Sequence, residues 1–272
     1  MKKRNYSLYF GISLVLLIIL LSLLSYVYLP YQVDEMNLSL RFSSPSSSHI
    51  LGTDQFGRDI FSRILVSTRS ALTVSTSSVC IGAVIGVALG SAAALLPHIF
   101  EMIIMRFVDA LMAFPGLLSA LMLSAVLGKG VLNAAIAISF FMVPIFARLA
   151  YSMILENKKK LYIKAAESYG ARGARLVVLY MLPDILSRLI TQLSSSIGLA
   201  ILTESSLSFL GLGIQPPGAS LGLMLAEAKG YVLIEPYQAL WPGVVLVIAV
   251  LGFSLLGDGI SEILRLRGDH EQ

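Results

Sequence analysis

The chain has 272 residues, of which 56% are hydrophobic and only 13% are charged. Soluble domains carry about a quarter charged residues, and no soluble core could bury several charge-free runs of roughly 20 residues, so the composition predicts a membrane protein. The net charge of +4 comes with no long basic face, which makes nucleic acid a poor candidate partner. The single cysteine, Cys80, excludes a disulfide within the chain. His49, His98 and His270 are isolated, predict no metal site, and are expected to be polar surface residues.

Six runs of the sequence are long and apolar enough to cross a bilayer as helices, which takes about 20 largely apolar residues. They are expected over residues 9–29, 70–97, 107–127, 130–146, 187–209 and 238–257. No clear cleavage site follows the first run, so we interpret it as an uncleaved anchor. Pro115 and Pro144 are expected to kink the third and fourth helices. The predicted fold class is an all-α integral membrane protein with six transmembrane helices.

The placement of basic residues orients these helices, because cytoplasmic loops carry an excess of Lys and Arg. Lys2, Lys3 and Arg4 precede the first helix and place the N-terminus inside, and six crossings return the C-terminus to the same side. Residues 148–188 then lie inside with eight basic and three acidic residues, whereas the outer segment 30–69 has four of each. Both termini are therefore predicted to be cytoplasmic.

One polar stretch, KAAESYGARGARLVVLYMLPD (164–184), separates the fourth and fifth predicted spans. Its first part favours a helix that ends at Gly170 through a left-handed residue, and a second helical run is expected to stop or bend at Pro183. Ala165 and Ala166 would let another surface approach closely. A helix–turn–helix of this kind suits docking in a groove of another protein. The alternative is a basic amphipathic hairpin that lies on anionic lipid.

The spacing within this stretch resembles the EAA motif of ABC importer permeases, which reads Glu-Ala-Ala, three residues, Gly, and later Leu-Pro. The matching residues are Ala165, Ala166, Gly170, Leu182 and Pro183. Lys164 stands where the motif has its Glu, and Glu167 follows three residues later. In that family the segment forms coupling helices that insert into a cleft of the ATPase subunit. The resemblance implies the same role for residues 156–184, including Lys164 and Glu167.

Five further strings resemble, in order, the C-type permeases of dipeptide, oligopeptide and nickel importers. They are LGTDQFGRDIFSRI (51–64), MRFVDALMAFP (105–115), SLSFLGLGIQPP (206–217), LGLMLAEA (221–228) and LLGDGISEIL (255–264). The resemblance implies a type I ABC importer permease fold in a bacterial cytoplasmic membrane. It also divides the chain into an anchor helix with an extracytoplasmic loop, a core permease and a short tail, at residues 1–69, 70–265 and 266–272.

The resemblance further implies the partners of such a subunit. A homologous B-type permease would supply the other half of the pathway, two ATPase subunits would bind ATP and Mg, and an extracytoplasmic binding protein would deliver the substrate. The chain contains no Walker A loop. It is therefore not expected to bind ATP by that route. The resemblance implies that the chain is no enzyme and holds no cofactor or metal, and that its remaining contact is with the lipid bilayer.

Three residues of the outer loop and one acid near the third helix are candidate functional residues. Gly57, Arg58 and Asp59 could form a turn whose salt bridge faces the binding protein or the partner permease. A solvated cap before the second helix is the alternative. Asp109 can pair with Arg106, three residues earlier on a helix, either as a structural ion pair or as a gate.

Glu204 is a second candidate for the pathway. It lies sixteen residues after Arg188, roughly 24 Å along a helix and toward the outer side. An acid at that depth should face the bundle interior or a wet cavity. Glu204 is therefore expected either to line or gate the pathway or to hold the outer loop.

The substrate remains open between di- or oligopeptides, nickel or another metal chelate, and other solutes. GRDIFSR (57–63) and EPYQALWPG (235–243) resemble nickel-type permeases slightly more.

Two other classes of protein are possible. A channel or ion-coupled transporter without an ATPase would need gating charges in several spans, and a membrane enzyme would need clustered His, Asp or Ser at one depth. The sequence favours the ATP-driven, binding-protein-dependent importer over both.

Overall fold

The computed structural model describes residues 6–268. Its ten α-helices are α1 (Tyr6–Val27), α2 (Ile60–Leu95), α3 (His98–Met112), α4 (Gly116–Leu127), α5 (Val131–Asn157), α6 (Leu161–Ser168), α7 (Gly173–Leu176), α8 (Leu182–Phe209), α9 (Leu221–Ala228) and α10 (Tyr237–Gly268). A 3-10 turn (Leu38–Leu40) lies in the loop after α1, and a π-helical turn (Val177–Met181) joins α7 to α8. Most of the predicted tail, with His270, and the basic residues Lys2 to Arg4 lie outside this range.

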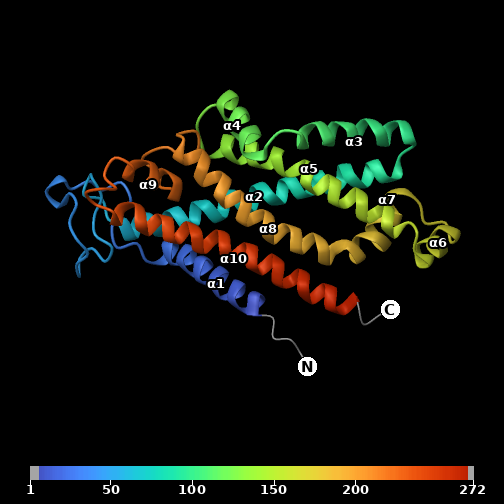
Figure 1. Ribbon diagram of the computed structural model, residues 1–272, viewed down its shortest axis with the longest axis horizontal. Helices are drawn as coiled ribbons and strands as arrows, with labels where there is room; N and C mark the ends of the chain where they lie inside the picture. The colour runs from blue at the N-terminus through green and yellow to red at the C-terminus, as the bar shows by residue number, and fades with distance from the viewer. Residues whose placement is uncertain (1–5, 269–272) are drawn as a thin grey trace.

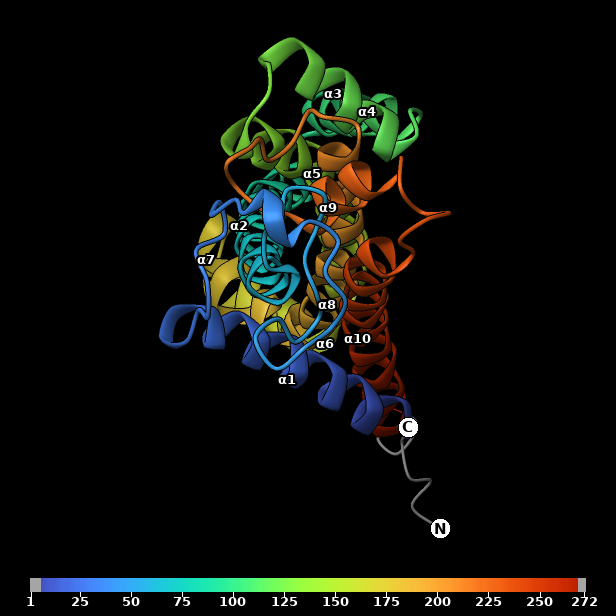
Figure 2. The same cartoon turned by 90° about the vertical axis from the view of Figure 1, so that its left-hand side faces the viewer.

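The helices form an elongated bundle in which α2, α5 and α8 occupy the middle (Figure 1). The end view shows α1 along one edge, with α10 beside it, and α3 and α4 along the opposite edge (Figure 2). The main hydrophobic core lies between α2, α5 and α8 and includes Val79, Ile138, Phe146 and Leu207. A second, smaller core joins α1 to α10 and contains Ile18 and Phe253.

Five of the helical segments are long and apolar enough to span a membrane, and α3 with α4 forms a sixth if the pair counts as one span. This agrees with the six predicted spans. Pro115 was expected only to kink the third span, but the axes of α3 and α4 differ by 91°. The backbone N–H that Pro115 lacks and the three-residue break at Ala113–Pro115 explain why the helix stops there and restarts. Pro144, in contrast, lies inside an uninterrupted α5.

The spans α2, α5, α8 and α10 are longer than predicted, and in α2 and α5 the added polar residues are paired. α2 begins at Ile60, ten residues before the predicted start, and its first turns bury Arg63 against Glu227. α5 continues to Asn157, so that Arg148 lies within the helix and not in a loop. Counting only charge-free residues therefore underestimated both helices.

A stripe of glycines allows α2 and α5 to approach closely. Gly82, Gly86 and Gly90 recur every four residues on α2. A Cβ added at Gly90 would lie 2.1 Å from the carbonyl oxygen of Ala147, and one at Gly86 would lie 2.5 Å from that of Val143. Small residues at this spacing are how helices approach each other in membranes, where dispersion forces and not the hydrophobic effect drive their association.

The two ends of the bundle differ. One end carries α9 and the loop of residues 28–59, and the other carries α6 and α7 (Figure 1). The loop folds on itself through backbone hydrogen bonds, among them Thr53 N–H to Ser43 O at 3.0 Å and Asn37 N–H to Phe56 O at 3.1 Å. The described ends of α1 and α10 that are nearest the chain termini both point toward the α6 end (Figure 1).

Candidate functional site

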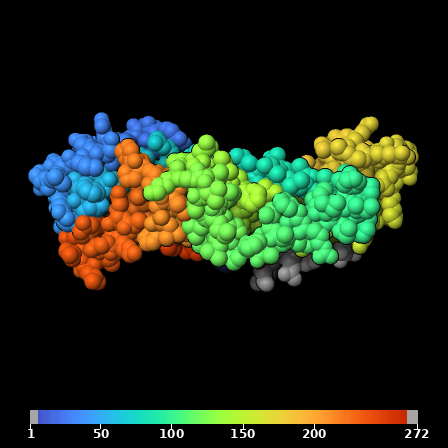
Figure 3. All heavy atoms as spheres, turned by 90° about the horizontal axis from the view of Figure 1, so that it is seen from above, coloured from blue at the N-terminus to red at the C-terminus, as the bar shows by residue number. Residues whose placement is uncertain are grey.

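The predicted coupling segment forms a projection at one end of the molecule. α5 ends at Asn157, a turn of three lysines follows, and α6 and α7 then reverse the chain into α8. Seen from above, these residues form a separate block at the end of the elongated body (Figure 3). The segment therefore lies at an end of the molecule that another protein could reach.

The inner face of α6 anchors the projection to the core. Ile163 and Ala166, three residues apart on one face of the helix, are buried and belong to the hydrophobic cluster that contains Leu176 and Met181. Ala165 and Ala166 were both predicted to meet a partner, but neighbouring residues on a helix point about 100° apart. Ala166 thus packs inside this chain, and only Ala165 faces outward.

The turn after α6 is the left-handed helix end that the sequence predicted. Gly170 has φ +91°. Its N–H donates to Glu167 O at 2.9 Å, and the N–H of Ala171 donates to Ala166 O at 3.0 Å. These two bonds form a Schellman motif, in which glycine is favoured at the left-handed position. The motif fixes the direction in which the chain leaves α6.

The outer face of the projection presents small and polar groups. Lys164, Ala165, Glu167 and Gly170 are all exposed, and the ring of Tyr169 is 94% exposed. Lys164, which occupies the position of the motif's acid, makes no side-chain ion pair within the described part of the chain. The face thus offers a shallow site at Ala165 and Gly170 beside a cation and an aromatic ring.

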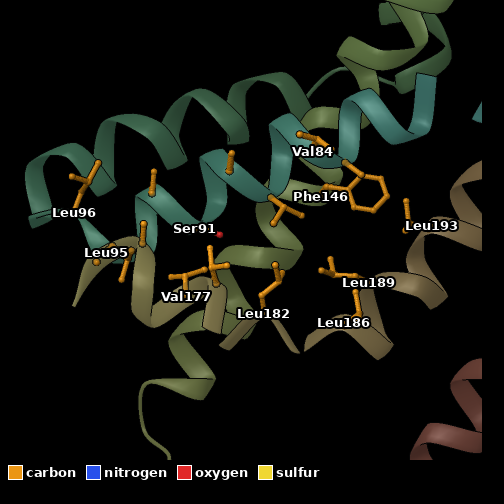
Figure 4. Close-up of a pocket in the computed structure, with 17 residues that line it drawn as sticks. Val84, Ser91, Leu95, Leu96, Phe146, Val177, Leu182, Leu186, Leu189 and Leu193 are labelled. Atoms are coloured by element: carbon orange, nitrogen blue, oxygen red, sulfur yellow. The ribbon is translucent and has the colours of Figure 1, made fainter. Parts of the chain in front are cut away.

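Pro183 does not stop the helical run; a stop was the first of the two outcomes expected there. The π-helical turn immediately precedes it, and α8 continues from Leu182 with Pro183 in its first turn, where proline is tolerated because that N–H needs no intrahelical partner. Leu182 points into a hollow of about 800 Å³ between α2 and α8 (Figure 4). Leu182 and Pro183 therefore shape the junction with α8, and Leu182 does not lie on the exposed face.

Two ion pairs reach the first turns of α8, one from the end of α5 and one from Lys160, which precedes α6. Lys160 Nζ lies 2.6 Å from Asp184 Oδ2, and Arg188 Nη1 lies 3.1 Å from Glu156 Oε2. The hydrogen bond to Asp184 raises the pKa of the Lys160 ammonium, so this pair stays ionised at neutral pH. Each exposed pair alone contributes little to stability, but together they define the spacing of α5 and α8 where the projection leaves the bundle.

The outer turn is buried and faces no partner. Of the two alternatives, it is the cap before the second span, since Asp59 caps α2, although the cap is buried and not solvated. Arg58 and Asp59 are 3% exposed. Arg58 Nε lies 2.6 Å from Asp54, and its Nη2 lies 2.8 Å from Glu227 on α9. Gly57 has φ +71° and lies against the carbonyl of Asn37, where a Cβ would be 1.8 Å from the oxygen. The turn therefore joins parts of this chain, and its side chains are not available to another protein.

Neither His49 nor Glu227 was predicted to lie beside this turn. His49, expected on the surface, is buried and stacks on Tyr31; its ring lies 2.9 Å from Asp59, which also caps α2. Glu227 lies 2.8 Å from Nη2 of Arg63 as well as close to Arg58. The sequence did indicate that Glu227 needs a partner, because it is the one acid of the apolar string LGLMLAEA.

Glu204 holds the outer end of α8. Its carboxylate is fully buried, and Ser208 Oγ donates to it at 2.8 Å. Ser208 Oγ in turn accepts from the backbone N–H of Ile214 at 3.1 Å, in the turn that follows α8. Glu204 is thus connected through Ser208 to the outer turn, and a role in the pathway stays a prediction.

Asp109 has a partner other than the one predicted. It contacts Arg148 of α5, and not Arg106 of its own helix. The prediction considered only neighbours along α3, whereas α3 packs alongside α5 (Figure 1). Among the residues that the structure describes, no group of three His, Cys, Asp or Glu side chains is placed to hold a metal ion.

The family likeness of the chain extends well beyond these motifs. The family model "Binding-protein-dependent transport system inner membrane component" matches residues 85–267. The chain belongs to this family. It is thus the permease subunit of an ABC importer and a multi-pass component of a bacterial inner membrane, which leaves no support for the alternative of an ion-coupled transporter or channel.

Curated relatives match this permease over most of its length. It is 40% identical over 251 residues to a glutathione transport system permease protein, GsiD, of Pectobacterium atrosepticum, covering 92% of this chain and 83% of the relative. It is 35% identical over 262 residues to a dipeptide transport system permease protein, DppC, of Alkalihalophilus pseudofirmus, covering 96% and 86%.

A solved structure supports the fold of the permease. The MetNI methionine ABC transporter in inward-facing conformations matches with a TM-score of 0.59 and 19% identity, over 73% of this chain and 95% of that chain. At this identity the likeness concerns the fold alone. It agrees with the expected type I ABC importer permease fold.

The N-cap of α9 offers a modest test of the outer end of the permease. The buried Ser220 Oγ accepts from Leu223 N–H at 3.1 Å at the start of the helix that carries Glu227. Ser220→Ala is expected to destabilise the folded subunit by about 1 kcal/mol. Thermal unfolding in detergent measures the loss, with the exposed Ser47→Ala as control; equal melting temperatures for the two variants would contradict the capping role.

Proposed function

We propose that this permease subunit imports small peptides, such as dipeptides or glutathione-like peptides. The names of the relatives at 35–40% identity support a peptide substrate. None of the relatives described above is named for nickel, and a metal chelate is therefore the second candidate, carried only by the resemblance of GRDIFSR and EPYQALWPG to nickel-type permeases. In this proposal the binding protein selects the peptide and the permease provides the path.

The α6 end is the cytoplasmic end in this proposal. Residues 148–188 carry eight basic and three acidic residues, and such an excess favours the cytoplasmic side. The ends of α1 and α10 that point toward α6 would then also be cytoplasmic (Figure 1). The binding protein would approach the opposite end, which carries α9 and the loop of residues 28–59.

Two ATPase subunits would bind ATP and Mg, and one of them would receive the projection formed by α6 and α7. The observation that carries this proposal is the exposed face around Ala165 and Gly170, held on a rigid base by buried Ile163 and Ala166. Because the pairs Lys160–Asp184 and Glu156–Arg188 connect that base to α5 and α8, a displacement of the projection would move both helices. Closure of the ATPases would thus shift the permease, with its B-type partner, between inward- and outward-facing states.

Uptake by the reconstituted importer tests the substrate. We expect proteoliposomes that contain this subunit, the B-type permease and the ATPases to accumulate a labelled dipeptide or glutathione when ATP and the binding protein are present. A non-hydrolysable ATP analogue is the control and should abolish accumulation. If the complex takes up free or chelated nickel and is not inhibited by any peptide, the peptide proposal is wrong and the metal chelate takes its place.

A further inference from the structure

The ion pair between Asp109 and Arg148 lies open on the surface of the bundle. The two side chains, on α3 and α5, are 47% and 49% exposed. Both helices belong to segments that pass as membrane spans by length and composition. The pair is therefore in contact with whatever surrounds this face of the subunit, and its surroundings must be able to accommodate charge.

The position of Arg148 along α5 places the pair well inside the helix. It precedes Glu156 by eight residues, roughly 12 Å along a helix, and Glu156, whose ion pair with Arg188 is exposed, lies at the end of α5. Ionised side chains at such depth are costly in hydrocarbon and are found facing a bundle interior or a water-filled cavity.

A second feature of the same face is also incompatible with lipid. The break between α3 and α4 exposes Ala113, Phe114 and Pro115, and α4 begins at Gly116 without a side-chain cap. Ala113 is four residues after Asp109 and lies on the same side of α3. Irregular backbone at membrane depth is tolerated only where it is buried in protein or lines a cavity that contains water.

The hollow into which Leu182 points is apolar, unlike the face around Asp109 and Arg148. Of the residues that line it between α2 and α8, Ser91 alone is polar (Figure 4). Apolar walls of this kind suit lipid or protein and not a hydrated solute. The α3–α5 face is thus better suited to contact with water than the hollow is.

We propose that the face around Asp109 and Arg148 forms part of the wall of the water-filled path through which the solute passes. This inference rests on the proposed function and specifies where its path runs along this subunit. Because the pair is neutral as a whole, it neither attracts nor repels a zwitterionic peptide strongly. Removing Asp109 would make the wall more positive, because Arg106 is also exposed three residues earlier on α3.

Cysteine labelling tests the proposal, and the chain requires only one change for a cysteine-free background, since Cys80 is its single cysteine. In a Cys80→Ala background, Met112→Cys adds a thiol one turn after Asp109, at a side chain that is 45% exposed. Leu16→Cys is the matched control, because Leu16 is 52% exposed in the middle of α1, a helix without charged residues. Both variants are studied in the assembled transporter, in vesicles of known orientation.

Charged, membrane-impermeant methanethiosulfonates are expected to modify Met112→Cys from the α6 side, at a rate that changes when the ATPases are trapped with nucleotide and vanadate. Leu16→Cys should resist modification in every state. Adding Asp109→Asn should raise the ratio of the rates for the anionic and cationic reagents by about tenfold, from the loss of one nearby charge, whereas Asp109→Glu should preserve it. If Met112→Cys resists both reagents in all states, or if Asp109→Asn leaves the ratio unchanged, the face is covered and the proposal is wrong. An importer that takes up no peptide but shows the labelling pattern would overturn only the peptide substrate.

Discussion

Replacing Ala165 by arginine is expected to abolish transport while the permease remains folded. Ala165 lies on the exposed face of α6 beside Gly170, and a long cation there would prevent close contact with the ATPase groove. Truncation or obstruction of a central contact costs about 2 kcal/mol or more, which corresponds to a roughly 30-fold loss of affinity. Co-purification of the ATPase subunits and ATP-dependent uptake measure this effect, and thermal unfolding of the permease should change little.

The control for this variant places arginine at the other end of the molecule. Ser47 is exposed in the loop that precedes α2, and Ser47→Arg adds the same side chain far from α6. We expect its complex to retain the ATPase subunits. Should Ala165→Arg bind the ATPases as tightly as Ser47→Arg does, coupling does not run through the exposed face of α6, and the hairpin is better explained as a surface element that lies on lipid.

Adding a single methyl group at Gly90 is expected to destabilise the bundle. The new Cβ would lie 2.1 Å from the carbonyl oxygen of Ala147, which is backbone of α5 and cannot rotate away. Overpacking of this kind costs typically 1–3 kcal/mol, against a gain of about 1 kcal/mol from the higher helix propensity of alanine. The clash should prevail, so that Gly90→Ala loses about 1 kcal/mol net and Gly90→Val loses more.

Thermal unfolding and the yield of monodisperse complex measure this loss. Gly230→Ala is the matched control, because a Cβ at Gly230 meets no atom within 4 Å; its stability should equal that of the wild type or slightly exceed it. Gly86→Ala, with its nearest atom at 2.5 Å, should be destabilising as well. Equal stability of Gly90→Ala and Gly230→Ala would mean that α2 and α5 are not held as closely as the stripe of small residues indicates.

Patterns that depend on neighbouring residues were predictable from the sequence. The six apolar runs, the helix end at Gly170 and the membrane class follow from composition and local chemistry, and the spacing of the coupling motif indicated the family. The partner of Asp109 was predicted wrongly, because the sequence offers only Arg106 nearby, whereas the fold places Arg148 beside Asp109. The burial of Ala166 was missed for a similar reason, since two adjacent alanines do not reveal which one faces the core.

The outer end shows most clearly what local reasoning omits. Asp54, Arg58 and Arg63 look like solvated loop charges until Glu227, far along the chain, comes to lie against both arginines. The same pairing explains why α2 begins at Ile60, whereas the charge-free run predicted a start ten residues later. A charge count identifies where water or a partner is needed, but only the tertiary fold determines that the partner is within the same chain.

The folded loop of residues 28–59 has a consequence for how any protein docks at that end. A flexible loop loses conformational entropy when a partner immobilises it, and this loss weakens binding. Here the backbone bonds within the loop and the buried arginines have already ordered it. A partner would therefore meet a surface of fixed shape, and encounters between the two proteins would need no folding step before the solute could be handed over.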